Sequence, residues 1–246
     1  MFKENVIKAL ILVGGKGTRL RPYTNVIPKS LLPVGDLPIL EIILMQLKIA
    51  GVSEVILAVG HMAHLFESFF QDGSRLGIKI SYSYEDKPLG TAGPIAYVLD
   101  DLGDDFIVMN GDLLTTLNYK EMFDLHQQRA AAATIASFNR KIKIDFGVLE
   151  FDSSQILKKY TEKPSYSFNL GMGINIINAN AASSFLVKGE YLDMPDLMMK
   201  IQHQGKAVFC HNEDCFWLDM GCPSDYDEAN EAFENMKDKF LPKYYK

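Results

Sequence analysis

A short stretch near the amino end combines glycines, a hydroxyl and fixed positive charges directly after an apolar run. The run Ala9–Val13 predicts a buried strand, and residues 14–19, which follow it, are Gly-Gly-Lys-Gly-Thr-Arg. Glycines let backbone N–H groups approach a ligand closely, and successive amides in such a turn form a concave anion site. Arg19 and the later Lys29 add charges suited to phosphate oxygens. The spacing therefore predicts a loop that binds a polyphosphate.

Two common phosphate loops do not fit this spacing. The Walker A pattern needs Gly-Lys-Ser/Thr after four residues, whereas Lys16 lies between glycines and no such triplet follows. The dinucleotide fingerprint needs a third glycine where Leu20 stands. Its acidic partner, about twenty residues further on, would be Asp36 or Glu41, and neither ends a second predicted strand. A nicotinamide dehydrogenase is therefore disfavoured.

A longer pattern does fit a known family. Residues 14–34 contain Gly-Gly-x-Gly-Thr-Arg-Leu-x-Pro-x-Thr and, three residues later, Pro-Lys-x-Leu-Leu-Pro-Val. This segment resembles the signature of the sugar-1-phosphate nucleotidyltransferases, except that Val13 stands where the family usually has alanine. The resemblance implies an NTP and a sugar 1-phosphate as substrates, with Arg19 and Lys29 as catalytic residues. It also implies nucleotide contacts from Leu12, Gly14, Gly15, Gly17, Thr18, Arg19 and Lys29.

Two distant aspartates extend the resemblance. Asp112 ends the segment Val-Met-Asn-Gly-Asp, and Asp219 stands in Trp-Leu-Asp-Met-Gly; both segments resemble the metal-binding motifs of the family. A triphosphate needs Mg²⁺ to neutralise its charge, and Mg²⁺ takes one or two carboxylates plus phosphate oxygens and waters. We therefore expect Asp112 and Asp219 to bind Mg²⁺. Cys222 replaces the usual threonine of the second motif, which should affect neighbouring contacts more than the aspartate.

The segment 89–92, Leu-Gly-Thr-Ala, resembles the part of the family that contacts the base. The resemblance places Gly90, Thr91 and the earlier Glu85 at the nucleotide. A carboxylate only accepts hydrogen bonds at neutral pH. Guanine offers adjacent N–H and NH₂ donors and suits Glu85 bidentately, whereas uracil offers one ring N–H. The Gly93-Pro94 pair also resembles the mannose-type guanylyltransferases. GTP is the expected nucleotide, and UTP, CTP and dTTP are the alternatives.

Residues of the second half resemble the sugar site of the family. In the motif Glu-Lys-Pro at 162–164, the resemblance implies that Glu162 accepts sugar hydroxyls and that Lys163, a third catalytic candidate, holds the sugar phosphate. Gly147 matches the glycine that lies against the sugar. The segment Leu170–Asn175 has Gly171 where the family has asparagine and Asn175 where it has tyrosine. The sugar contacts should therefore differ from the pattern of the family. The resemblance to the mannose- and heptose-1-phosphate guanylyltransferases implies a mannose- or heptose-type 1-phosphate as the sugar substrate.

A function of another class is a catalytically silent regulator that binds nucleotide sugars. The substitutions at Gly171, Asn175 and Cys222 favour it, whereas the two aspartates and Arg19 are intact. Pyrophosphate release with any sugar phosphate would exclude this alternative.

Strand and helix patterns alternate through the first half and would position these residues. This alternation predicts an α/β fold with a Rossmann-like, mostly parallel sheet flanked by helices. In such sheets ligands bind beyond the carboxyl ends of the strands, so the first loop and Asp112 could share one cleft. The predicted strands are Ile7–Val13, Glu54–Val59, Ile78–Tyr84, Phe106–Met109 and Ala131–Phe138, and the predicted helices are Ile39–Ala50, His61–Phe70, Ala92–Leu102 and Tyr119–Gln128.

The second half is more irregular and is expected to form a sugar-binding lobe on the same sheet. No Gly/Ser/Pro-rich linker separates the halves, so residues 1–246 are predicted to be a single nucleotidyltransferase domain. Its nucleotide-binding half would end at about residue 138, and its sugar-binding half would span about 139–246. No hexapeptide repeat follows residue 223, so a left-handed β-helix is not expected. The predicted elements of this half are strands at Phe146–Phe151 and Leu170–Ile177 and helices at Ala179–Val187 and Asp193–Gln204.

The bulk composition limits the partners and the compartment. The 246 residues are 48% hydrophobic and 23% charged, as in ordinary globular proteins. A net charge of −6 argues against nucleic acid or a membrane surface as partner. The three cysteines show no Cys-x-x-Cys spacing, and the apolar run Val6–Val13 is too short for a membrane span. We expect a cytoplasmic protein that is a monomer or a dimer.

Overall fold

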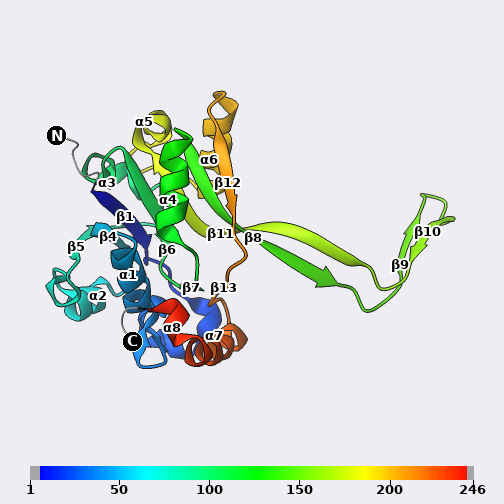
Figure 1. The fold of residues 1–246 in the computed structure, drawn as a ribbon, viewed down its shortest axis with the longest axis horizontal. Helices are drawn as coiled ribbons and strands as arrows, with labels where there is room; N and C mark the ends of the chain where they lie inside the picture. Colours follow the sequence, from blue (N-terminus) through cyan, green and yellow to red (C-terminus); the bar gives the residue numbers. More distant parts are fainter. Residues whose placement is uncertain (1–5, 243–246) are drawn as a thin grey trace.

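The computed structural model describes residues 6–242, and its central layer within them is a seven-stranded sheet. The strands are β1 (Ile7–Leu12), β4 (Val52–Val59), β5 (Lys79–Tyr84), β6 (Asp105–Asn110), β8 (Ala133–Lys143), β11 (Ser165–Asn178) and β12 (Val208–Asn212). They lie in the order β12-β8-β11-β6-β1-β4-β5 (Figure 1). Neighbours are parallel except at β11, which is antiparallel to both β6 and β8. The predicted mixed, mostly parallel α/β fold is confirmed.

Helices cover both faces of this sheet because successive strand residues point to opposite sides. Ile11 of β1 belongs to one hydrophobic core and the adjacent Leu10 to the other. Apolar side chains of α1 (Ile39–Ile49), α2 (Ala63–Phe70), α4 (Tyr119–Gln128), α7 (Pro223–Asn235) and α8 (Lys237–Phe240) fill the first core. Those of α3 (Ile95–Leu102), α5 (Ala179–Ala182) and α6 (Met194–His203) fill the second.

Shorter elements complete the described chain. Two-residue strands β2 (Pro33–Val34) and β3 (Leu37–Pro38) pair after the first loop, and β7 (Leu113–Thr115) pairs antiparallel with β13 (Trp217–Asp219). The strands β9 (Val148–Phe151) and β10 (Leu157–Thr161) form a separate antiparallel pair. Single 3₁₀ turns lie at Thr18–Leu20, Tyr23–Asn25, Lys29–Leu31, Ser74–Leu76 and Ser183–Phe185.

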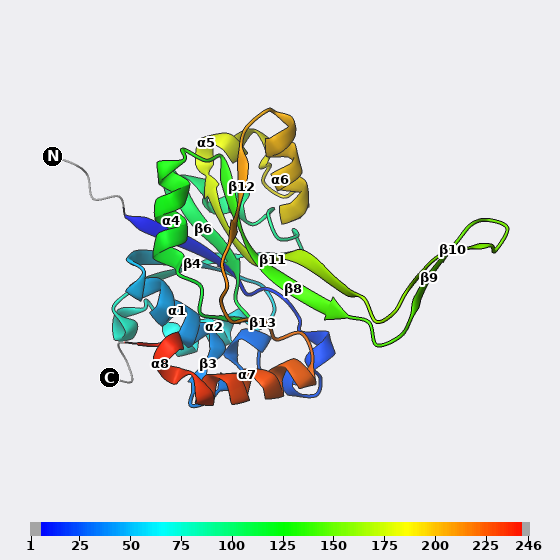
Figure 2. The same ribbon diagram turned by 45° about the vertical axis from the view of Figure 1, so that its right-hand side comes forward.

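A long hairpin leaves the body of the molecule and carries β9 and β10 at its end (Figures 1 and 2). We call residues 139–169 the arm. Strand β8 pairs with β12 only as far as Ser137, and β11 pairs with β6 only from Ile174 onward. Beyond these points β8 and β11 pair only with each other, from Phe138 opposite Leu170 to Lys143 opposite Ser165. The sheet thus continues outward as a two-stranded ribbon.

Most predicted elements are observed within a few residues, and the differences have local causes. The helix predicted from Ala92 begins at Ile95, because Ala92 N–H and Gly93 N–H donate to the carbonyl of Leu192 and hold a turn instead. The helix predicted over Ala179–Val187 is α-helical only to Ala182, where serines follow, whose hydroxyls compete with helical backbone bonds. The strand predicted to end at Phe138 continues to Lys143 as part of the arm. The single-domain prediction and its division at about residue 138 stay predictions; its outermost residues, 1–5 and 243–246, lie outside the described residues.

The base of the arm contains a matched pair of glycines. The register between β11 and β8 shifts between Gly171 and Asn175. Gly173, which lies within this shift, has φ +73°, and a Cβ on it would lie 2.9 Å from Asn110 Nδ2. A Cβ on Gly171 would meet no atom within 4 Å among the described residues.

We predict that Gly173→Ala lowers the free energy of unfolding by about 1–3 kcal/mol, because alanine is strained at this φ and crowds Asn110. Gly171→Ala should stay within about 0.5 kcal/mol. Urea unfolding of both variants measures this, and equal midpoints would contradict it.

Candidate active site

The glycine-rich loop follows β1 at the carboxyl edge of the sheet, between the ends of β4 and β6. Val13 N–H donates to the carbonyl of Ala58 at 3.0 Å, and Gly111 N–H donates to the carbonyl of Leu12 at 3.0 Å. A Cβ on Gly111 would lie 2.4 Å from Val13 Cγ1, so only glycine lets the β6 end approach the loop this closely. The loop and the turn that carries Asp112 are therefore neighbours.

Several loop residues predicted to bind nucleotide have the geometry of an open backbone turn. Gly14 packs against Gly60, whose N lies 3.5 Å from the position of a Gly14 Cβ, whereas Gly15 is exposed. Gly17 is left-handed with φ +57°, and its carbonyl accepts a 2.7 Å hydrogen bond from the Thr24 hydroxyl. Thr18 and Arg19 are exposed. An exposed glycine-rich turn with an exposed guanidinium can accept an anionic ligand.

Lys29 brings the two predicted metal ligands together. Its Nζ forms an ion pair with Asp112 Oδ2 and a second one of 3.3 Å with Asp219 Oδ1. Burial raises the pKa of the Asp112 carboxyl; the Lys29 ammonium opposes this rise, and the Asp219 carboxylate adds to it. Arg19 also reaches this place, since its Nη1 lies 3.5 Å from where a Cβ on Gly221 would be. Four predicted residues from three separate segments thus converge beside the loop.

The pairing of β7 with β13 makes this convergence possible. Asp219 lies opposite Leu113, the residue after Asp112, and Met220 N–H donates to the carbonyl of Asp112 at 3.2 Å. Two short strands far apart in the sequence therefore place both carboxylates at one edge. Cys222 follows as the N-cap of α7, and its N–H donates to Asp225 Oδ2 at 2.7 Å.

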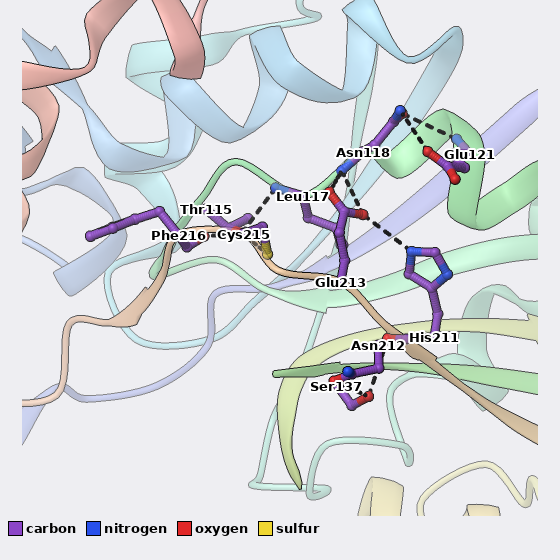
Figure 3. A network of polar contacts seen from close by, with 10 residues as sticks. All are labelled: Thr115, Leu117, Asn118, Glu121, Ser137, His211, Asn212, Glu213, Cys215 and Phe216. Carbon is purple, nitrogen blue, oxygen red and sulfur yellow. Dashed lines mark hydrogen bonds and ion pairs between the residues drawn. The ribbon is translucent and has the colours of Figure 1, made fainter. Parts of the chain in front are cut away.

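A polar network fixes the register of this strand pair (Figure 3). The Glu213 carboxylate accepts hydrogen bonds from Asn118 N–H at 3.2 and 3.3 Å and lies 3.2 Å from His211 Nε2. The buried Thr115 hydroxyl donates to the carbonyl of Phe216 at 2.7 Å. These contacts tie the segment that leads into β13 to the segment that leaves β7. A shift of one segment along the other would separate Asp219 from Asp112.

The donors present fit a hard divalent cation. Within residues 6–242, Asp112 Oδ1 is buried and accepts no hydrogen bond, although buried carboxylate oxygens are normally satisfied. Asp219 offers a second carboxylate on the same lysine. The described chain contains no group of three or more His, Cys, Asp or Glu that could hold a metal. A site with two protein carboxylates suits Mg²⁺, which keeps waters and phosphate oxygens as its other ligands.

The predicted base-contacting residues lie further along the same edge. Glu85 follows β5, and its carbonyl oxygen lies 3.9 Å from the position of a Gly60 Cβ beside the first loop. Burial raises the pKa of the Glu85 carboxyl, and the Leu89 amide opposes this by hydrogen bonding to the charged form. The Thr91 hydroxyl accepts a 2.7 Å hydrogen bond from Met194 N–H, and Gly90 packs on Leu192. Gly90 and Thr91 therefore also hold the start of α6.

The predicted sugar-binding residues divide into two groups. Gly171 and Asn175 lie at the base of the arm, where Gly171 is exposed and Asn175 is buried in β11. Gly147, Glu162 and Lys163 lie in the arm, in the connections to β9 and β10 (Figure 1). The structure of one chain does not bring this second group to Lys29 and the aspartates. Their assigned roles stay predictions.

Sequence patterns did not indicate two features of the site. One is the position of Lys29 between the carboxylates, which was predicted only as a phosphate contact. The other is Trp217, the only tryptophan of the chain, whose Nε1–H donates to the carbonyl of Met172 at 3.0 Å and whose ring lies 6.1 Å from that of Phe138. It links the base of the arm to β13, and its place two residues before Asp219 was the available signal.

The fold and the site define a class of protein, and a match to a family model defines the family. The arrangement of a mostly parallel α/β sheet with a glycine-rich loop and carboxylates at its carboxyl edge is that of a nucleotide-binding α/β protein. A family model described as nucleotidyl transferase matches residues 8–236. The chain belongs to this family of enzymes, and the resemblance seen in the sequence is confirmed.

Individual relatives differ in the substrates that their names contain. The chain is 32% identical over 242 residues to a UTP–glucose-1-phosphate uridylyltransferase of Synechocystis, covering 91% of this chain. It is 36% identical over 240 residues to the mannose-1-phosphate guanylyltransferase catalytic subunit beta of Danio rerio, covering 89% of this chain. The chain spans 62% of the length of each of these curated relatives.

A solved structure supports the fold. HddC from Yersinia pseudotuberculosis, complexed with GMP-PN, matches with a TM-score of 0.70 at 22% identity, covering 93% of this chain and all of that one. Separately, no helix among residues 6–242 is long and apolar enough to cross a membrane.

We predict that Thr115→Val lowers the free energy of unfolding by about 1–3 kcal/mol, because the Leu117 N–H loses its acceptor and the Phe216 carbonyl keeps only the Thr116 N–H of its two donors. Thermal unfolding measures this. The matched control is Thr161→Val, since the half-buried Thr161 side chain makes no hydrogen bond within the described chain and its replacement should change stability by under about 0.5 kcal/mol. Equal melting temperatures for the two variants would contradict the role of Thr115.

Proposed function

We propose that the chain transfers a nucleotidyl group from an NTP to a sugar 1-phosphate and releases pyrophosphate. An oxygen of the sugar phosphate would attack the α-phosphorus while the bond from that phosphorus to the pyrophosphate oxygen breaks. The observation that carries the proposal is the convergence of Asp112, Asp219 and Lys29 beside the glycine-rich loop, in a chain of the nucleotidyl transferase family. The sugar phosphate is already an anionic nucleophile, so alignment and charge neutralisation suffice.

The loop and its cations would bind the triphosphate. Exposed amides around Gly15 and the Arg19 guanidinium would hold the β- and γ-phosphates, where pyrophosphate develops negative charge. Lys29 would contact the α-phosphate or the attacking oxygen. Its ammonium now neutralises two carboxylates. A cation on those carboxylates would leave the lysine charge available to the substrate.

Asp112 and Asp219 would hold Mg²⁺. The buried, unpartnered Asp112 Oδ1 and the Asp219 carboxylate are oxygen donors of the kind this ion prefers. When bound, Mg²⁺ supplies positive charge that offsets the charge of the triphosphate. The two carboxylates themselves would orient the substrates by fixing the position of that charge.

The nucleotide and the sugar are proposed from chemistry at the edge of the site. Glu85 would accept the two adjacent N–H donors of guanine, and a relative is named as a mannose-1-phosphate guanylyltransferase. We therefore propose GTP with a mannose- or heptose-type 1-phosphate. Another relative is named for UTP and glucose 1-phosphate, so UTP is the second candidate. Glu162 and Lys163 would bind the sugar hydroxyls and its phosphate, with Gly147, Gly171 and Asn175 near the sugar. A cytoplasmic location and the absence of nucleic-acid or membrane partners belong to the same proposal.

A grid of four NTPs against hexose and heptose 1-phosphates, followed by pyrophosphate release, tests the reaction. Release with at least one pair is expected, with GTP as the preferred nucleotide. No release with any pair would overturn the proposed function and favour a silent binding protein.

We expect Arg19→Ala to lower kcat by roughly 10²–10³-fold, the scale for losing one preorganised charge at the developing anion. Arg21→Ala is the matched control, because Arg21 is an exposed arginine of the same loop to which no contact with the substrate is assigned. Steady-state kinetics with the best substrate pair measures both. Near-normal turnover of the Arg19 variant would refute its role.

Glu85→Gln should lower kcat/KM for GTP by about 10–100-fold, because a hydrogen bond to a charged group contributes roughly 1.5–3 kcal/mol and the new amide opposes one guanine donor. UTP should lose much less, since it presents a single ring N–H. Competition between the two nucleotides measures the ratio. An unchanged GTP preference would show that Glu85 does not contact the base.

A further inference from the structure

The arm carries much of the exposed apolar surface of the described chain. Nine of its nineteen exposed large hydrophobic side chains lie between residues 142 and 168, which is far more than the length of that segment explains. Phe146 is 79% exposed, Phe151 63% and Tyr160 61%. Soluble proteins rarely expose such clusters unless another surface covers them. An isolated two-stranded ribbon is also marginally stable in water. The arm therefore requires a partner surface.

The arm of one chain points away from the carboxyl edge of its own sheet, where Lys29 and the two aspartates lie. Its strands pair residue by residue from Phe138 opposite Leu170 to Lys143 opposite Ser165, and Ile144 N–H donates to the carbonyl of Pro164 at the far end. This ladder has no break between those points. In both views the arm points outward from the body (Figures 1 and 2). Glu162 and Lys163, which lie between β10 and the outer end of this ladder, are therefore separated from Lys29 in the same chain.

The body of the molecule also exposes apolar side chains, beside Lys29 and the two aspartates. Tyr23, Val26 and Ile27, in the loop that carries Arg19 and Lys29, are exposed. This apolar strip adjoins α7, since the rings of Tyr23 and Tyr226 lie 5.9 Å apart. The sequence of α7 contains five acidic residues and no lysine or arginine. The arm, in contrast, contains six basic and four acidic side chains in a chain whose net charge is −6.

We infer that the chain forms a two-fold dimer in which the arm of each copy lies on the loop and α7 of the other, and that Lys163 and Glu162 complete the partner's site. Apolar arm side chains would cover Tyr23, Val26 and Ile27, while arm lysines would face the acidic α7. Such an exchange of identical elements closes with the same patch on both subunits. The inference rests on the proposed function for the roles of Lys163 and Glu162, whereas the dimer itself rests on the surfaces alone.

Light scattering after size exclusion tests the dimer independently of activity. The wild-type chain should show about twice the monomer mass of 27.6 kDa at micromolar concentration. The double variant Phe146→Asp with Phe151→Asp should raise the dimer dissociation constant by at least about 100-fold, because it places charges in an apolar contact. Phe69→Asp, an exposed phenylalanine of α2, should leave the dimer intact. Circular dichroism confirms that each variant is folded. A monomeric wild type would overturn the inference.

Complementation tests whether the site is shared. Lys163→Ala and Arg19→Ala chains carrying different tags are produced together, and the mixed dimer is purified through both tags. If sites are completed by the partner, one site of the mixed dimer has both native residues, so about half of the wild-type rate returns. If each site uses its own Lys163, both sites stay defective and the rate stays at the level of the single variants. That result in an active enzyme overturns the shared site.

A cross-linking readout works even if the proposed reaction fails. A photoreactive residue at position 163 of an unlabelled chain, mixed with an isotope-labelled chain, should cross-link to residues 14–29 of the labelled copy. Cross-links confined within one copy would overturn the inference, whatever the substrate is. Failure of the proposed function appears instead as absent pyrophosphate release in a dimer that still cross-links between copies.

Discussion

The arrangement of the candidate site depends on two carboxylates that meet at one lysine. Asp112 and Asp219 would repel each other in a partly buried place, and Lys29 lies between them as a counter-charge. The raised pKa of Asp112 reflects this balance, in which burial and a neighbouring carboxylate outweigh the ammonium. Such a cluster is poorly explained as a device for stability, because buried ion pairs contribute little net free energy. It is well explained as a place prepared for a cation and a polyanion.

The fold keeps these charges together with few degrees of freedom. The short pair β7–β13 fixes Asp219 opposite the residue that follows Asp112, and the contacts of Thr115 and Glu213 fix the register of that pair. The glycine at position 111 lets the end of β6 approach the glycine-rich loop. Both hydrophobic cores include side chains of the strands that end at this edge. The charged groups of the candidate site thus lie at the ends of packed strands, while the exposed glycine-rich loop is open to a ligand.

The sequence predicted the body of the fold better than its extensions. Helix α1 and strand β4 have strong apolar periodicity, and both were located within two residues. The glycine-rich loop and the two aspartates were found by motif, but their proximity depends on β13, a three-residue strand with no periodicity to detect. The arm was missed for a similar reason. Its residues alternate like an ordinary half-buried strand, and only the missing neighbours on both edges reveal that the strand has left the sheet. The local sequence pattern does not show whether a strand has neighbours from distant parts of the chain.

Calorimetric titration with nucleotide is the most direct test of the central claim that Lys29, Asp112 and Asp219 form the binding site of a metal-bound triphosphate. GTP with Mg²⁺ should bind the wild-type chain, and binding should weaken by at least about tenfold either without the metal or in an Asp112→Asn, Asp219→Asn double variant, since each loss removes charge compensation at the phosphates. Equal affinity in all three titrations, or no heat with any of the four common nucleotides, would contradict the account.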